Sequence, residues 1–64
     1  MKVLVIGGGG RCHAIVDSLS RSERVSKIYC APGNAGIGTQ AELVPIPVSD
    51  IHGLLEFAQA EDID

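Results

Sequence analysis

The sequence predicts an α/β fold, a partial Rossmann-like domain with three layers, three parallel strands in the order 3-2-1 and two helices. Three apolar stretches, residues 3–6, 25–31 and 43–48, have the composition of strands. Segments with helical spacing of apolar residues follow the first and the third of them. Strand, helix and strand within about thirty residues form a βαβ unit with a right-handed crossover.

The first predicted strand, residues 3–6, is a continuous apolar run of the kind that lies buried on both faces of a parallel sheet. The helix that follows is predicted at about residues 11–21. The inner stripe expected for it consists of Ile15, Val16 and Leu19. The second strand, residues 25–31, is closed by a Pro-Gly turn.

The third predicted strand, residues 43–48, contains Pro45 and Pro47. Backbone N–H groups alternate in direction along a strand, so both prolines remove donors from the same side. Such a strand is tolerated mainly at a sheet edge. The donors expected toward the second strand are the N–H groups of Val44, Ile46 and Val48.

The last helix is predicted to begin after a cap at Ser49 or Asp50. Its expected apolar face consists of Ile51, Leu54, Leu55 and Ala58. Residues 62–64 then begin a new approach to the sheet. Because the order 3-2-1 leaves one side of the first strand unpaired, we interpret residues 1–64 as an incomplete N-terminal domain, truncated before a fourth strand. We also expect self-association through that edge.

Composition excludes several classes of function. A net charge of −3 and only two aromatic residues argue against a nucleic-acid partner. The apolar run at the N-terminus is too short for a signal peptide or a membrane span, so we predict a cytoplasmic protein. Cys12 and Cys30 lack the spacing of a metal site or a disulfide framework, and two free thiols are favoured over one disulfide.

Residues 6–14 read IGGGGRCHA and place four glycines where the first strand meets the first helix. Open α/β sheets bind ligands at this carboxyl end. Glycine permits the positive φ of a tight turn and lets an anion approach backbone N–H groups, while the helix N-terminus adds about half a positive charge. Arg11 is placed to add a bidentate phosphate contact. The run therefore predicts a phosphate-binding loop, and the alternative is a turn without a ligand.

Two nucleotide motifs fit this loop poorly. In the dinucleotide fingerprint G-x-G-x-x-G the third glycine position falls on Cys12 or His13. The second strand ends in Cys-Ala-Pro-Gly-Asn, without the carboxylate that holds a ribose. The Walker A pattern lacks its Gly-Lys-Ser/Thr. A dinucleotide-binding Rossmann module of an NAD-dependent oxidoreductase therefore remains as the weaker alternative.

Three segments, MKVLVIGGGGRCHA, VSKIYCAPGNAG and DIHGLLEFAQAEDID, together resemble the start of the phosphoribosylamine–glycine ligases. These glycinamide ribonucleotide synthetases belong to the ATP-grasp superfamily. The resemblance covers the whole chain and depends most on GGRxHA and APGNAG in this order and spacing. It implies a pre-ATP-grasp domain of an enzyme that joins glycine to 5-phosphoribosylamine, through a glycyl phosphate made from ATP, in de novo purine biosynthesis.

The resemblance implies a set of substrate-binding residues in the two loops. By position they are Gly8, Gly9, Gly10, Arg11, His13, Gly33, Asn34 and Gly36. A packing or capping role for His13 stays equally open, as does a purely conformational role for Asn34 in its turn. The family usually has serine at position 8 and glutamate at position 12. Cys12 therefore replaces a carboxylate that would interact favourably with the helix dipole.

The resemblance places ATP and Mg²⁺ or Mn²⁺ in later domains. The 64 residues contain no pattern of paired general acid and base, nucleophile triad or metal ligands. We therefore expect no catalytic residue in this fragment, no bound cofactor or metal ion, and no activity when it is alone. A non-catalytic fragment that acts only through its exposed sheet edge is the third hypothesis. His52 is expected to be solvated.

Overall fold

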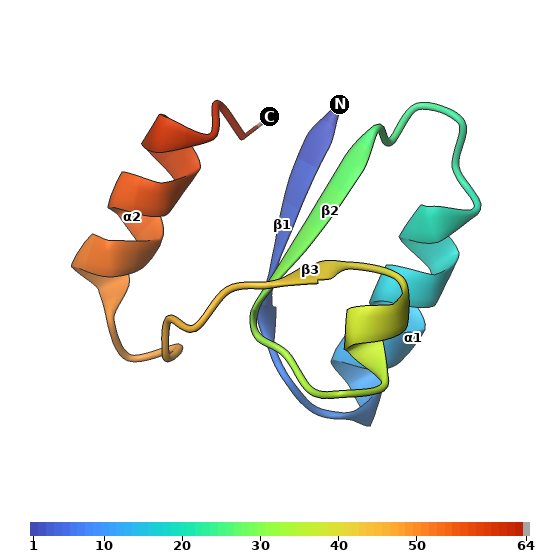
Figure 1. Cartoon of the computed structure of the whole chain (residues 1–64), viewed down its shortest axis with the longest axis horizontal. Helices are drawn as coiled ribbons and strands as arrows, with labels where there is room; N and C mark the ends of the chain where they lie inside the picture. Colours follow the sequence, from blue (N-terminus) through green and yellow to red (C-terminus); the bar gives the residue numbers. More distant parts are fainter. Residues whose placement is uncertain (64) are drawn as a thin grey trace.

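A computed structural model describes residues 1–63 of the chain. The elements follow the order β1 (Lys2–Gly7), α1 (Gly10–Ser20), β2 (Lys27–Pro32), the 3₁₀ turn η1 (Ile37–Thr39), β3 (Glu42–Leu43) and α2 (Ile51–Ala60). The strands form one parallel sheet in the order β1-β2-β3, which confirms the predicted 3-2-1 arrangement. Figure 1 shows α1 and α2 on opposite sides of this sheet, so the fold has three layers.

The central strand β2 supplies both cores. Its register with β1 runs from Lys2 opposite Lys27 to Gly7 opposite Pro32. Successive side chains of a strand point to opposite faces. On the α1 side the buried cluster consists of Val5, Val16, Ile28, Cys30 and Ile37. On the α2 side it consists of Tyr29, Ala31, Val44 and Leu54. Parallel strands covered on both faces in this way are predominantly apolar, as β2 is.

The inner stripe of α1 differs from the prediction at one position. Val16 is fully buried and Leu19 is half-buried, as expected, but Ile15 is 44% exposed. Cys12 occupies the remaining inner position and packs against the core. A helix turns by about 100° per residue, so Cys12, Val16 and Leu19 share one face and Ile15 lies beside it.

The third strand is shorter than predicted. Glu42 and Leu43 pair with Tyr29 and Cys30, and the Val44 N–H donates to the Cys30 carbonyl at 2.9 Å, as expected. The Ile46 N–H instead donates to the Val44 carbonyl at 2.8 Å. This bond closes a γ-turn centred on a proline, whose fixed φ suits that turn. The chain therefore leaves the sheet at Val44, and the expected pairing of residues 45–48 with the second strand is wrong.

The N-terminus of α2 is capped as predicted, and the cap is Asp50. Its carboxylate accepts a hydrogen bond from the Gly53 N–H at 3.0 Å. The buried face is centred on Leu54, whereas Ile51 and Leu55, which we expected inside, are 73% and 54% exposed. Phe57 packs instead, and Leu55 lies about 200° around the helix from it.

The C-terminal end of α2 is held to the sheet by Tyr29. The Tyr29 and Phe57 rings meet edge to face with their centroids 5.0 Å apart. The Tyr29 hydroxyl donates to Glu61 Oε1 at 2.9 Å, and this bond, followed by burial, raises the pKa of Tyr29. Beyond the helix, Ile63 packs against the same cluster. The predicted approach of residues 62–64 to the sheet therefore begins there, and residue 64 lies outside the described residues.

Candidate functional site

Two glycine-containing loops meet at the carboxyl ends of β1 and β2. The first loop is residues 7–10 and the second loop is residues 33–36. The Gly33 N–H donates to the Gly7 carbonyl at 2.9 Å, and Asn34 Nδ2 donates to the Gly8 carbonyl at 2.6 Å. A Cβ at Gly8 would lie only 2.8 Å from the Gly33 carbonyl oxygen. The two backbones are therefore in direct contact.

The second loop also contacts the start of α1. A Cβ at Gly36 would lie 3.2 Å from His13 Cε1, so the imidazole sits against the position where Gly36 has no side chain. Asn34 Oδ1 accepts a hydrogen bond from the Ile37 N–H at 3.0 Å. The fold thus brings Gly8, His13, Asn34 and Gly36, all residues that the resemblance implied, close together.

The N-terminus of α1 is open and electropositive. Gly9 is the N-cap and supplies no capping side chain, and the first turn contains no acidic residue. The N–H groups of this turn have no partner within the helix and carry the positive pole of its dipole. Arg11 is exposed, and its guanidinium makes no hydrogen bond or ion pair with any of residues 1–63. A shallow cavity of about 320 Å³ runs from this end along one side of α1, lined by Gly10, His13, Ala14 and Asp17.

The four glycines of the first loop fall into two pairs. Gly7 has a φ of +142°, and a Cβ there would overlap Cys12 Sγ. Gly8 is required by its close approach to the second loop. In contrast, a Cβ at Gly9 or Gly10 would meet no described atom within 4 Å, and Gly9 has an ordinary φ of −89°. Packing thus explains the first pair, whereas the second pair borders open space.

The two thiols pack beneath the first loop. Cys30 is fully buried, and its thiol donates to the Gly7 carbonyl at 3.4 Å. Burial, with the neighbouring Cys12 as the smaller cause, raises the pKa of the Cys30 thiol. Both cysteines are free, which confirms the preferred interpretation of the sequence. His52 is exposed, as expected.

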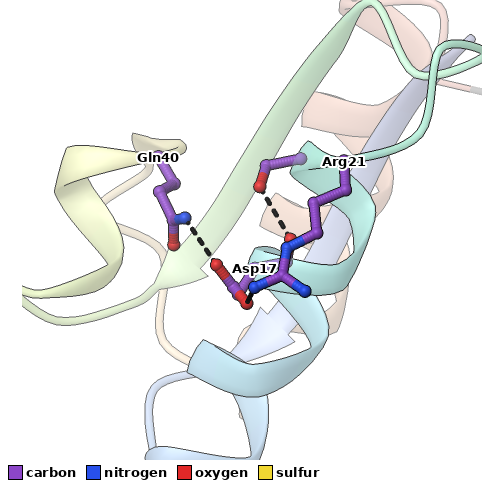
Figure 2. Close-up of polar contacts among 4 residues, drawn as sticks. Asp17, Arg21 and Gln40 are labelled. Atoms are coloured by element: carbon purple, nitrogen blue, oxygen red, sulfur yellow. Dashed lines mark hydrogen bonds and ion pairs between the residues drawn. The ribbon is translucent and has the colours of Figure 1, made fainter.

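Asp17, which the sequence did not single out, joins α1 to the end of η1. Its carboxylate accepts hydrogen bonds from Arg21 Nη2 and Gln40 Nε2, both at 2.8 Å (Figure 2). The spacing of Asp17 and Arg21, at i and i+4 of a helix, was a signal for the ion pair. No local pattern indicates the contact with Gln40, because 23 residues separate it from Asp17.

A second, larger cavity of about 520 Å³ lies away from the glycine loops. It is bordered by the end of α1, the start of β2 and the segment from η1 to β3, with Ser20, Lys27 and Gln40 in its wall. This is the amino end of the strands. Open α/β sheets bind their ligands at the opposite, carboxyl end. We therefore place the candidate site at the two loops, where the cavity is smaller.

The described residues 1–63 also limit other chemistry. Within them, no helix has both the length and the apolar character that crossing a bilayer requires. No three side chains of His, Cys, Asp or Glu in this part of the chain lie close enough together to hold a metal ion.

Comparison with known proteins gives one family over the whole chain. The family model described as "Phosphoribosylglycinamide synthetase, N domain" matches residues 1–64. The chain belongs to this family. A phosphoribosylamine–glycine ligase of Caldanaerobacter subterraneus is 67% identical over 64 residues, and those of Xylella fastidiosa and Escherichia coli are each 52% identical over 66 residues. These matches cover all of this chain but only 15% of each relative.

The family assignment agrees with the geometry of the two loops. GGRxHA and APGNAG are the motifs on which the resemblance depended, and their residues are in contact across the carboxyl edge of the sheet. The family assignment leaves the oxidoreductase alternative without support, and β2 is followed by Gly33 and Asn34 rather than by a ribose-binding carboxylate.

Proposed function

We propose that this chain forms the N-terminal part of an ATP-dependent ligase that joins glycine to 5-phosphoribosylamine in purine biosynthesis. Its two loops hold the phosphate of phosphoribosylamine. The relatives bear the name phosphoribosylamine–glycine ligase, which supports the reaction. The observation that carries the site is the open space over Gly9 and Gly10, at a helix N-terminus whose exposed Arg11 makes no ion pair with any described residue.

The chemistry of this corner suits a phosphate. Backbone N–H groups at the start of α1 donate toward an anion, and the helix dipole favours its negative charge. Arg11 adds charge-assisted hydrogen bonds of the fork geometry that matches phosphate oxygens. Gly36 leaves room for the His13 imidazole, which borders the shallow cavity along α1, and Gly33 leaves room for Leu43.

The remaining substrates bind to other parts of the complete ligase. ATP, Mg²⁺ or Mn²⁺ and glycine bind outside residues 1–64 in this proposal, and the fragment alone is inactive. The enzyme acts in the cytoplasm, where free thiols such as Cys12 and Cys30 stay reduced. In this proposal, phosphoribosylamine is the substrate that the two loops bind.

Replacing Arg11 by alanine in the complete ligase tests the proposal. The change removes a charge-assisted hydrogen bond worth about 1.5–3 kcal/mol. The KM for phosphoribosylamine should rise by about ten- to a hundredfold, since each 1.4 kcal/mol is a factor of about ten. The KM values for ATP and glycine should hardly change. Steady-state kinetics measures all three.

Arg24 supplies the matched control, because it is another exposed arginine but lies beyond the far end of α1. Arg24→Ala should leave every constant unchanged. If Arg11→Ala raises the KM for ATP and leaves the KM for phosphoribosylamine unchanged, the loop binds ATP and the proposed ligand is wrong. If none of the three KM values changes, the glycine run is a turn without a ligand.

We further propose that residues 1–64 are an incomplete domain whose β1 edge pairs with a further strand. The carbonyls of Met1 and Gly7 accept bonds from the chain on the β2 side. By alternation along the strand, the backbone groups of Leu4 and Ile6 face the other edge, which no described strand covers. An apolar edge of this kind promotes pairing between chains.

The 64-residue chain alone should therefore self-associate through β1. Sedimentation velocity should show dimers or larger species whose proportion rises with concentration. Ile6→Lys places a charge beside the edge and should shift the population toward monomer. A monodisperse unmodified chain that melts cooperatively above about 60 °C, beyond most mesophilic domains, would contradict the proposal.

A further inference from the structure

The carboxamide of Asn34 bonds to the protein itself at both ends. Its Nδ2 donates to the Gly8 carbonyl at 2.6 Å, and its Oδ1 accepts from the Ile37 N–H at 3.0 Å. The residue is half-buried between the two loops. The carboxamide of asparagine has two N–H donors and an oxygen that can accept two bonds, and one donor and one acceptor site are already engaged within the protein. These two bonds indicate that Asn34 joins the two loops rather than contacting the substrate.

The bonds from the second loop fix the direction of two consecutive peptide groups. In a trans peptide, the C=O and the following N–H point in opposite directions. The Gly7 and Gly8 carbonyls are held by the Gly33 N–H and by Asn34 Nδ2. The cis bond among the described residues is Ala31–Pro32, so both of these peptides are trans. The N–H groups of Gly8 and Gly9 therefore point away from the second loop.

Such a constraint matters in a run of four glycines. Glycine has the widest choice of backbone conformations, so an unrestrained run would sample many orientations of these N–H groups. Gly9 is the N-cap, next to the open space at the start of α1. A backbone donor at this point contributes most to anion binding when its direction is already fixed. Binding then costs no conformational entropy for ordering the loop.

We propose that Asn34 is a positioning residue of the phosphate site, which orients the Gly8–Gly9 peptide and does not itself touch the substrate. The inference rests on the proposed function and replaces, for Asn34, the direct contact that the family resemblance implied. The clamp requires the donor of a carboxamide. A carboxylate at position 34 keeps the acceptor for Ile37 but sets a negative oxygen against the Gly8 carbonyl.

The test compares Asn34→Ala and Asn34→Asp with Gln40→Ala in the complete ligase. Gln40 is a matched control, because its carboxamide also ties the segment after β2 to the first βα unit, but through Asp17 and away from the glycine loop (Figure 2). Hydrogen–deuterium exchange is measured without ligand and with inorganic phosphate, on the peptide covering residues 31–38 for contact between the loops and on the peptide covering residues 5–14 for protection by phosphate. Steady-state kinetics gives kcat and the KM for phosphoribosylamine.

In Asn34→Ala, the amide of Gly33, whose N–H donates to the Gly7 carbonyl across the two loops, should exchange faster in the absence of any ligand. The KM for phosphoribosylamine should rise by about three- to tenfold, as expected for one neutral hydrogen bond, with kcat within about twofold of the unmodified enzyme. Asn34→Asp should raise KM further, and it remains informative if the alanine variant fails to fold, because it keeps the bond to Ile37. Gln40→Ala should change neither measurement.

Other outcomes would overturn the inference. A higher KM with unchanged exchange in the ligand-free protein would make Asn34 a direct substrate contact. Faster exchange with an unchanged KM would show that the clamp does not serve binding. Failure of the proposed function is separate, because in that case Arg11→Ala would also leave KM unchanged and inorganic phosphate would not protect residues 8–10 from exchange in the unmodified enzyme.

Discussion

Gly9→Val in the complete ligase should leave the fold intact and raise the KM for phosphoribosylamine by about a hundredfold or more. Gly9 has φ −89° and ψ −175°, an extended conformation that valine adopts readily. A Cβ there meets no described atom within 4 Å. The two added methyl groups therefore enter only the space through which the phosphate must approach. Several charge-assisted hydrogen bonds, each worth about 1.5–3 kcal/mol, are lost together.

The loss in this variant should appear in binding and hardly in stability. Valine is a poorer N-cap than glycine, so the unfolding free energy should fall by no more than about 1 kcal/mol. Ser18→Val is the matched control, an exposed position of the same helix two turns away, and its KM should not change. If the KM for phosphoribosylamine is unchanged in Gly9→Val, the phosphate does not bind at this loop. Collapse of the thermal transition would instead show that Gly9 serves the fold.

The position of the candidate site could be predicted because it depends on local order along the chain. An apolar strand followed by glycines and a helix places the loop at the carboxyl end of the sheet, whatever the rest of the fold does. The prolines at 45 and 47 similarly predicted the edge position of the third strand. They did not reveal its length, because the γ-turn at Pro45 closes on Val44 and competes directly with the ladder.

Features that depend on contacts between residues far apart in the chain could not be predicted from the sequence. Ile15 and Val16 are equally apolar, yet Val16 is fully buried in the core cluster and Ile15 is exposed, and contacts with other elements decide between them. The bond from Asn34 to Gly8 joins residues 26 apart in the chain. Nothing in Pro-Gly-Asn-Ala-Gly distinguishes an asparagine that binds a ligand from one that binds the other loop. The same holds for the four glycines, which look equivalent in sequence and differ in what surrounds each.

Gly7→Ala should have the largest effect on stability, and it should act on the fold alone. The φ of +142° at Gly7 is one that L-residues rarely adopt, and the new Cβ would overlap Cys12 Sγ. Backbone strain of this kind costs about 1–3 kcal/mol, and overpacking adds about 1–3 kcal/mol. The 64-residue chain should therefore melt at least about 10 °C lower, since 1 kcal/mol shifts a domain of this size by about 4–8 °C.

A double-mutant cycle separates the two causes in Gly7→Ala. Cys12→Ala removes the overlapping sulfur, so the pair of changes should cost less than the sum of the single ones, and the shortfall measures the overlap. The backbone strain remains, because no change at position 12 relieves φ at position 7. Gly10→Ala is the matched control: its Cβ meets open space in the first turn of α1, and alanine should stabilise the helix by up to about 1 kcal/mol. If Gly7→Ala melts at the same temperature as the unmodified chain, the first loop does not adopt this conformation. The peptide directions inferred for the phosphate site would then also be wrong.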